Sequence, residues 1–158
     1  VWEGTRPLLL EAQALVDASA LGNPRRVAVG FEHNRLSMLL AILHRHGGLQ
    51  VGDQDVFVNA VGGIRIDETS SDLALILAVV SSFRNRALPL GLVCFGEVGL
   101  SGEIRPVPNG QERIREAAKH GFRIAIVPEG NKPRQQVSGM KVILVRKLGD
   151  VLAALEEL

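Results

Sequence analysis

The stretch that decides the fold is DETSSDLALILAVVSS, residues 67–82, in which hydroxyl and carboxyl side chains precede a run of apolar ones. A helix formed by this run would carry apolar side chains on almost every side, so no face of it would suit water. We therefore expect a helix that is buried on most sides. Its core residues would be Leu73, Leu75, Ile76, Leu77, Val79 and Val80.

The polar start of this helix allows two interpretations. Asp67, Thr69 and Ser70 belong to residue types that cap helices, and a carboxylate at Asp72 is favoured by the positive end of the helix dipole. A serine in this place can instead be a nucleophile, provided that a neighbouring base accepts its proton. The choice between capped helix and catalytic serine depends on residues elsewhere in the chain.

Hydrophobic patterns predict alternating strands and helices around this segment. A helix is expected from Asn34, as its cap, to His46, followed by Gly47 and Gly48. The run LGLVCFGEV is expected to pair with GEIRPV across a glycine turn. The expected strands are 6–16, 25–31, 54–60, 90–98, 102–107, 123–130 and 141–148, and the other helices are 109–121 and 149–158.

These elements indicate one domain of mixed class. Strands predominate early and alternate with helices later, so the class is α/β or α+β, with a mixed sheet flanked by helices. The chain has 158 residues, of which 46% are hydrophobic, and this suffices for a single core over residues 1–158. Because the sequence starts close to a strand and without methionine, we expect it to be excised from a longer protein.

Charge and composition exclude several classes of protein. The formal net charge of +1 provides no general attraction to nucleic acid or anionic membrane, so any DNA contact requires a local patch. No apolar run is long enough for a membrane span and the first residues lack the charged, apolar and small-residue pattern of a signal peptide, so we expect a soluble, cytoplasmic protein without a membrane partner. The single cysteine, Cys94, lies in an apolar run and is expected to be a buried strand residue.

Common catalytic and binding motifs are absent from the sequence. There is no glycine-rich string followed by lysine and a hydroxyl residue, so the chain is not expected to hydrolyse ATP. The glycines of GEVGLSG lie between two expected strands and indicate a hairpin rather than a dinucleotide site. His44 and His46 are two positions apart on one expected helix, where side chains diverge, so no metal site is expected.

Several strings together resemble a known family: GNPRR, EHNRL, QDVFVNAVGG, FGEVGLSGEIRPVP and RIREAAKHGF. They are similar to the carboxy-terminal domain of the RadA (Sms) family of bacterial DNA-repair proteins, over nearly the whole chain. That domain in turn resembles the peptidase domain of Lon proteases. The resemblance implies a Lon-protease-like fold, of the kind also seen in domain 2 of ribosomal protein S5.

The Lon resemblance also tests whether Ser70 is a nucleophile. Lon proteases use a serine in an Asp-Gly-Pro-Ser-Ala-Gly string, which corresponds here to residues 67–72 and places Ser70 at the nucleophile position. The flanking glycines of Lon are replaced by Glu68 and Asp72. The Lon string that carries the catalytic lysine corresponds to residues 108–113, which places Gln111 at the position of the base.

A carboxamide cannot accept the serine proton near neutral pH, so the dyad of Ser70 and Gln111 is expected to be vestigial. Arg113 lies two positions further, about 200° round the helix, and Lys119 lies roughly 12 Å along it, so neither is expected to replace the base. We therefore expect no enzyme activity from this domain. A working serine-lysine peptidase is the remote alternative.

The family resemblance further implies what the domain does. Proteins of this family carry a zinc finger and a RecA-like ATPase, form hexameric rings and use ATP to drive branch migration of recombination intermediates. Zinc, ATP and magnesium are thus expected only outside this chain, which needs no cofactor or metal of its own. The domain would contribute self-assembly into a homo-hexamer and contact with single-stranded or branched DNA.

Arginines at turns and element ends are the candidates for DNA contact: Arg25, Arg26, Arg35, Arg65, Arg105 and Arg113. Further basic residues at Arg115, Lys119 and Arg123 suit a solvated surface. The alternative to DNA binding is a pure oligomerisation scaffold, in which arginines pair with acidic residues of a neighbouring subunit.

Overall fold

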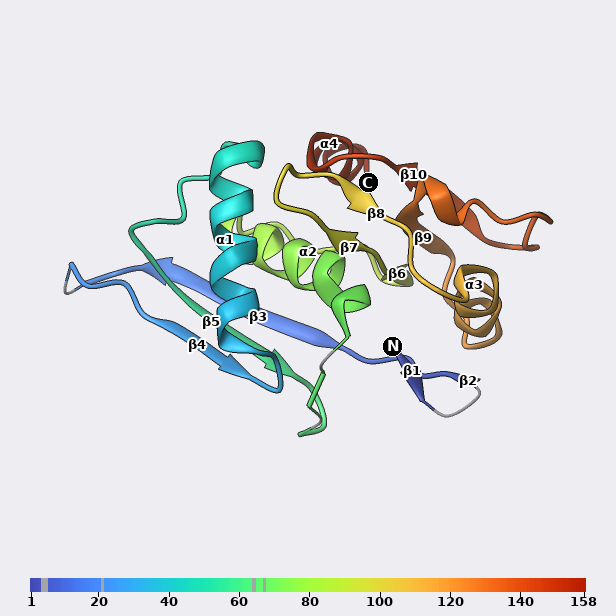
Figure 1. Cartoon of the computed structure of the whole chain (residues 1–158), viewed down its shortest axis with the longest axis horizontal. Helices are drawn as coiled ribbons and strands as arrows, with labels where there is room; N and C mark the ends of the chain where they lie inside the picture. The colour runs from blue at the N-terminus through green and yellow to red at the C-terminus, as the bar shows by residue number, and fades with distance from the viewer. Residues whose placement is uncertain (4–5, 21, 64, 67) are drawn as a thin grey trace.

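The computed structural model describes residues 1–3, 6–20, 22–63, 65–66 and 68–158. Two three-stranded sheets and four α-helices make up most of it, and two short strand pairs complete it (Figure 1). The expected class is confirmed, because parallel and antiparallel strands are both flanked by helices. Among the described residues, no helix has the length and apolar character needed to cross a membrane.

The first sheet is mixed and has the order β3-β5-β4. Strand β3 (Ala12–Ala18) is antiparallel to β5 (Gln54–Ala60), while β4 (Arg26–Val29) is parallel to it. Val56, Val58 and Ala60 alternate along β5 and are all buried, as the sequence predicts. Helices α1 (His33–Gly47) and α2 (Asp72–Phe83) pack on the sheet (Figure 1), and the Val16 amide of β3 donates to the α2 hydroxyl of Ser82 at 2.8 Å.

The second sheet is parallel and has the order β10-β9-β6. It consists of β10 (Lys141–Val145), β9 (Ile124–Pro128) and β6 (Leu92–Cys94). Side chains of β9 alternate between two cores, since Ala125 and Val127 pack with Ile114 of α3 (Gly110–Lys119), while Ile126 packs in the core that includes α2 and α4 (Leu148–Glu157).

Short strand pairs and 3-10 turns lie outside the two sheets. Strand β1 (Trp2–Glu3) pairs with β2 (Arg6–Pro7), and β7 (Glu97–Val98) pairs with β8 (Ile104–Arg105). The 3-10 turn η1 (Thr69–Ser71) directly precedes α2, and the 3-10 turn η2 (Glu129–Asn131) directly follows β9. The turn η1 leads directly into α2, so it fixes the place of Ser70.

The buried helix is the most accurate prediction from the sequence. Leu73, Ile76 and Val80 of α2 are each no more than 1% exposed, and the other apolar residues named for this core are also buried. The strand position of Cys94 is also borne out, since it lies on β6, where it is partly buried and desolvation raises the pKa of its thiol to about 12.

Two expected strands are interrupted. The strand predicted over 6–16 is divided into β2 and β3, with residues 8–11 in neither strand. The strand predicted over 90–98 is divided at Gly96, which has φ 153°. A β-carbon at Gly96 would lie only 3.2 Å from both Ile104 and Pro128, so the chain turns here in close contact with two neighbouring segments.

The predicted cap of the first helix is wrong by two residues. Glu32, not Asn34, caps α1, and its two carboxylate oxygens accept from the amides of Asn34 at 3.0 Å and Arg35 at 2.7 Å. A carboxylate can accept hydrogen bonds from two amides at once and also interacts favourably with the helix dipole. Glu32 is therefore a better cap here than Asn34. The predicted end is confirmed by Gly48, whose φ of 69° is left-handed.

Candidate functional site

Ser70 is held in the η1 turn, at the start of the buried helix α2. Its side chain is 6% exposed, and its hydroxyl has no hydrogen-bond partner among the described residues. The neighbouring hydroxyls do have partners, since Thr69 donates to Glu97 and Ser71 donates to the carbonyl of Glu68 at 2.8 Å. Neither Thr69 nor Ser70 caps α2 through its side chain, so that prediction is wrong, and Asp67 lies outside the described residues.

Two hollows of the surface meet at Ser70. The inner one has a volume of about 70 Å³ and is lined mainly by apolar side chains, including Leu10, Phe31 and Val93. The outer one is an open cleft of about 510 Å³ between the η1 turn and the segment that joins β8 to α3. Ser70 and Arg113 line both hollows.

Arg113 is the basic group beside Ser70. It is 7% exposed, its Nε donates to the carbonyl of Pro108 at 2.9 Å, and its Nη2 lies 3.5 Å from a carboxylate oxygen of Glu68. The guanidinium also stacks over the ring of Phe95, with its central carbon 5.9 Å from the ring centroid. The sequence places Arg113 about 200° round the helix from position 111, and in the fold it is Arg113 that shares both hollows with Ser70.

Gln111 lies in the first turn of α3 but lines neither hollow at Ser70. Its side-chain oxygen accepts from the amide of Arg134 at 2.9 Å, which directs the carboxamide to the loop before β10. The first turn of α3 therefore brings Arg113, and not Gln111, to the serine. The residue before α3, Asn109, has a left-handed backbone, a local feature that spacing along a helix does not show.

The chemistry available at Ser70 is limited by these neighbours. Among the described residues that line the two hollows, there is no lysine and no histidine. A guanidinium does not deprotonate in proteins, so Arg113 cannot accept the hydroxyl proton. The carboxylates of Glu68 and Glu97 in the cleft are engaged by Arg113 and Arg105, and they would oppose a developing oxyanion.

A second polar group, Asp72, lies two residues after Ser70 and is 1% exposed. Both of its oxygens accept from Arg35 of α1, with Nε at 2.9 Å, and one of them also accepts from the amide of Val98 at 3.0 Å. Burial raises the pKa of Asp72, against the opposing effect of these bonds, while the bond to Asp72 raises the pKa of Arg35. This pair joins α1, α2 and β7.

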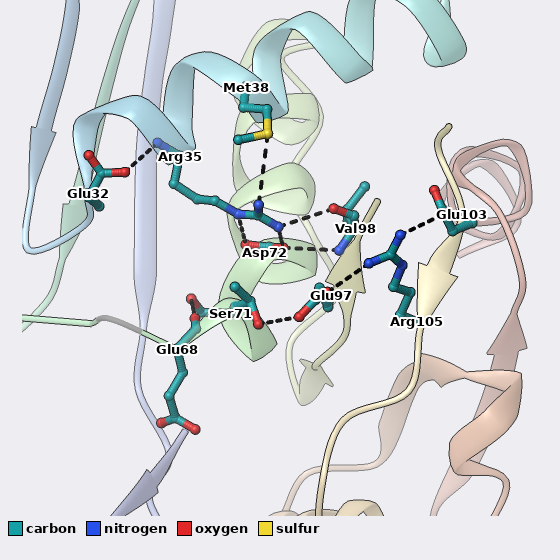
Figure 2. A network of polar contacts seen from close by, with 11 residues as sticks. Glu32, Arg35, Met38, Glu68, Ser71, Asp72, Glu97, Val98, Glu103 and Arg105 are labelled. Atoms are coloured by element: carbon teal, nitrogen blue, oxygen red, sulfur yellow. Dashed lines mark hydrogen bonds and ion pairs between the residues drawn. The ribbon is translucent and has the colours of Figure 1, made fainter. Parts of the chain in front are cut away.

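A surface network adjoins the pair, as Figure 2 shows. Arg105 of β8 lies 3.4 Å from Glu97 of β7 and 3.0 Å from Glu103. The bond from Arg105 lowers the pKa of Glu103, so this carboxylate stays charged at neutral pH. Two of the predicted DNA-binding residues, Arg35 and Arg105, are thus brought close together, but each is bonded to carboxylates.

The remaining predicted DNA-binding residues lie elsewhere. Arg25 contacts Asp55 at 3.2 Å and stacks on Phe57, although its side chain is 65% exposed. Arg26 donates to the backbone carbonyls of Gln54 and Val51, so it supports the edge of the first sheet. Arg65 is exposed in the loop before η1. The structure does not gather the six arginines into one surface.

A different group of cations lies on the surface, around the end of α3. Arg115 and Lys119 are exposed one turn apart on α3, and Arg123 and Lys141 are exposed at adjacent ends of β9 and β10, where the Lys141 amide bonds to the Arg123 carbonyl at 2.8 Å. We call these four residues the α3 basic cluster. The basic residues between positions 113 and 123 indicate most of this cluster in the sequence. Lys141 joins it only through the pairing of β9 with β10, which the sequence does not show.

The described part of the chain has no group of three or more histidine, cysteine or acidic side chains placed to hold a metal ion. The ring nitrogen of His46 instead contacts the carbonyl of Leu100 at 3.0 Å, which fastens the β7–β8 turn to the end of α1.

Comparison with known proteins places the chain in a family. A family model described as subunit ChlI of Mg-chelatase matches residues 19–131, which is more than half of the chain. The chain belongs to this ChlI family. The matched region contains α2, Ser70 and Arg113.

Individual relatives of this ChlI-family chain carry a DNA-repair name. The chain is 71% identical to the DNA repair protein RadA of Haemophilus influenzae and 68% identical to that of Escherichia coli, in both cases over all 158 residues. It is 44% identical to RadA of Bacillus subtilis over 95% of the chain. It is thus homologous to RadA throughout, and it spans about a third of the length of these curated relatives.

Proposed function

We propose that this chain is the non-proteolytic, Lon protease-like part of a cytoplasmic DNA-repair ATPase that drives branch migration, and that it contributes DNA contact and ring assembly. The observation that carries the proposal is the 71% identity to a DNA repair protein over the whole chain. ATP, magnesium and zinc would be bound by parts of the longer protein outside this chain. The partners would be single-stranded or branched DNA and further copies of the protein in a homo-hexamer.

The geometry at Ser70 supports a role without proteolysis. A serine peptidase needs a base within hydrogen-bond reach of its hydroxyl. Here the hydroxyl has no hydrogen-bond partner among the described residues, and the basic side chain that lines both hollows is that of an arginine. An active serine-lysine peptidase is therefore disfavoured.

The α3 basic cluster is a better candidate for DNA contact than the arginines first considered. Arg35 and Arg113 are largely buried and bonded, so a phosphate could reach them only at the cost of internal bonds. The side chains of Arg115, Lys119, Arg123 and Lys141 are exposed. In a ring, such a cluster would be repeated in every subunit, so moderate contacts would combine into tight binding.

Fluorescence anisotropy with a labelled single-stranded oligonucleotide and a branched duplex tests this proposal. We expect binding that weakens steeply with salt, because phosphate contacts release counterions. The double variant Arg115→Glu with Lys119→Glu should weaken DNA binding about tenfold or more, irrespective of the DNA sequence. Arg45→Glu with Lys132→Glu makes the same charge change at exposed positions outside the cluster and serves as the control. Salt-insensitive binding, or equal loss in the control, would contradict the assignment.

Self-assembly without DNA contact is the second candidate, and one observation favours it. The outer face of the first sheet carries Leu15, Val27 and Val29, which are 59%, 41% and 53% exposed, beside Phe57. Exposed apolar side chains in adjoining positions are typical of protein contacts. Sedimentation should therefore show assembly that Val27→Glu weakens and Asn59→Glu, on the same face, weakens less. A chain that stays monomeric at all concentrations would reject the scaffold.

A further inference from the structure

The inner hollow at Ser70 contains a polar group to which the described residues supply no hydrogen bond. The hydroxyl of Ser70 is buried and unpartnered among the described residues, whereas the Ser71 hydroxyl beside it is already bonded to Glu68. Leaving a buried hydroxyl unbonded is unfavourable, so such a group in a cavity indicates a place for a ligand atom or water. The hollow also presents the guanidinium of Arg113, which is 7% exposed.

The remaining walls are mostly apolar, although Val1, Glu11 and Ser71 also line the hollow, and the space is small. Side chains of Leu8, Leu10, Phe31, Ile66, Val93 and Phe95 line the hollow, whose volume is about 70 Å³. This is room for more than one water molecule. A guanidinium and a hydroxyl together match a carboxylate, since both donate and one is charged. The apolar walls match a short aliphatic group attached to it.

We propose that this hollow binds a carboxylate that carries a short aliphatic group, either a free short-chain acid or the carboxy terminus of a polypeptide. One carboxylate oxygen accepts from the Ser70 hydroxyl and the group pairs with Arg113, while the aliphatic part contacts Phe31 and Val93. Glu68, which lies 3.5 Å from Arg113 and has a side chain 37% exposed, competes with the ligand for the guanidinium. The proposal is independent of DNA contact and of the α3 basic cluster.

Titration of the ¹⁵N-labelled chain with butyrate, followed by amide chemical shifts, tests the proposal. We expect saturable shifts around Ser70 and Phe95, and butyramide, which has the same shape but no charge, should bind at least about tenfold more weakly. Ser70→Ala should weaken butyrate about tenfold while leaving distant amide shifts unchanged. Glu68→Gln should strengthen it several-fold, and Glu103→Gln, the same change at a carboxylate paired elsewhere, should not.

The peptide Gly-Gly-Val and its carboxamide distinguish the two sources of the carboxylate. Tighter binding of the peptide than of butyrate identifies a polypeptide terminus, whereas binding of butyrate alone identifies a free acid. Either result supports the site. Absence of saturable shifts with both ligands, equal binding of butyrate and butyramide, or unchanged binding by Ser70→Ala would overturn it and leave the hydroxyl to water.

Discussion

Ser70 and Asp72 lie two residues apart at the start of the same buried helix, yet their polar groups differ in hydrogen bonding. Asp72 is 1% exposed and accepts bonds from Arg35 and from the Val98 amide, whereas Ser70 is 6% exposed and has no described partner. A buried charge without partners is far more costly than a buried hydroxyl without one. The comparison indicates that Asp72 holds elements together, while Ser70 is tolerated by the fold.

The largest expected effect on stability comes from removing Asp72, the residue of the two that is hydrogen-bonded. Asp72→Ala removes the carboxylate and leaves the guanidinium of Arg35, which is 25% exposed, without its main partner. Loss of one member of a buried ion pair costs about 3–5 kcal/mol. We expect urea denaturation to show a decrease of about this size in the free energy of unfolding. A loss below about 1 kcal/mol, the range of an exposed ion pair, would contradict the structural role.

Replacing both members of the pair should be less harmful than removing one. Arg35→Met with Asp72→Asn removes both charges and keeps an acceptor for the Val98 amide. Because neutral groups of similar shape often replace a buried pair at little cost, we expect a loss of about 1–2 kcal/mol. If the double variant is as unstable as the sum of its single changes, the two side chains are not coupled.

Acid titration sharpens the contrast between the buried pair and a surface pair. Burial raises the pKa of Asp72 above 3.8, so its contribution to stability is greatest below pH 3.8 and is lost as the pH rises through the folded pKa. The bond from Arg146 lowers the pKa of Glu129 below 4.5, so that contribution is present above pH 4.5 and is lost as the pH falls.

Carboxyl carbon shifts followed by NMR should therefore place the two midpoints on opposite sides of their ordinary values. Glu129→Gln should also reduce the loss of stability on acidification, because the carboxylate of Glu129 is then no longer there to be protonated. A midpoint for Asp72 below 3.8 would show that the bonds from Arg35 outweigh burial.

The smallest expected effect on stability comes from changing Ser70, whose hydroxyl has no described hydrogen bond. Ser70→Ala removes a hydroxyl that makes no described bond and keeps the β-carbon. We expect the free energy of unfolding to change by at most about 0.5 kcal/mol, with stabilisation as the preferred sign, because an unsatisfied buried group is removed. A loss above about 2 kcal/mol would show that Ser70 has a structural bond.

The sequence predicted the buried helix well because its apolar pattern contains the packing information. Leu73 and Ile76 could only be core residues, and the alternation of Val56 and Val58 could only be a half-buried strand. The partners of polar groups were not predictable in this way. Arg35 meets Asp72 across 37 residues, and only the packing of α1 on α2 brings them together.

The candidate site was predicted in part. The position of Ser70 at the mouth of the helix follows from the sequence pattern, but its basic neighbour does not. Gln111 and Arg113 are two residues apart and follow the left-handed residue Asn109, yet only Arg113 lines the hollows at Ser70. Local backbone geometry of this kind leaves no signal in hydrophobic periodicity.

The central claim is that Ser70 belongs to a site whose described lining has no lysine or histidine base, and labelling by a serine-reactive fluorophosphonate tests it most directly. The intact chain is incubated with the reagent and analysed by peptide mass spectrometry, alongside an assay of cleavage of an unfolded protein. We expect no adduct at Ser70 and no cleavage, both in the natural chain and in Gln111→Lys, whose side chain at position 111 is directed to the loop at Arg134. An adduct at Ser70, together with cleavage that Ser70→Ala abolishes, would contradict the account.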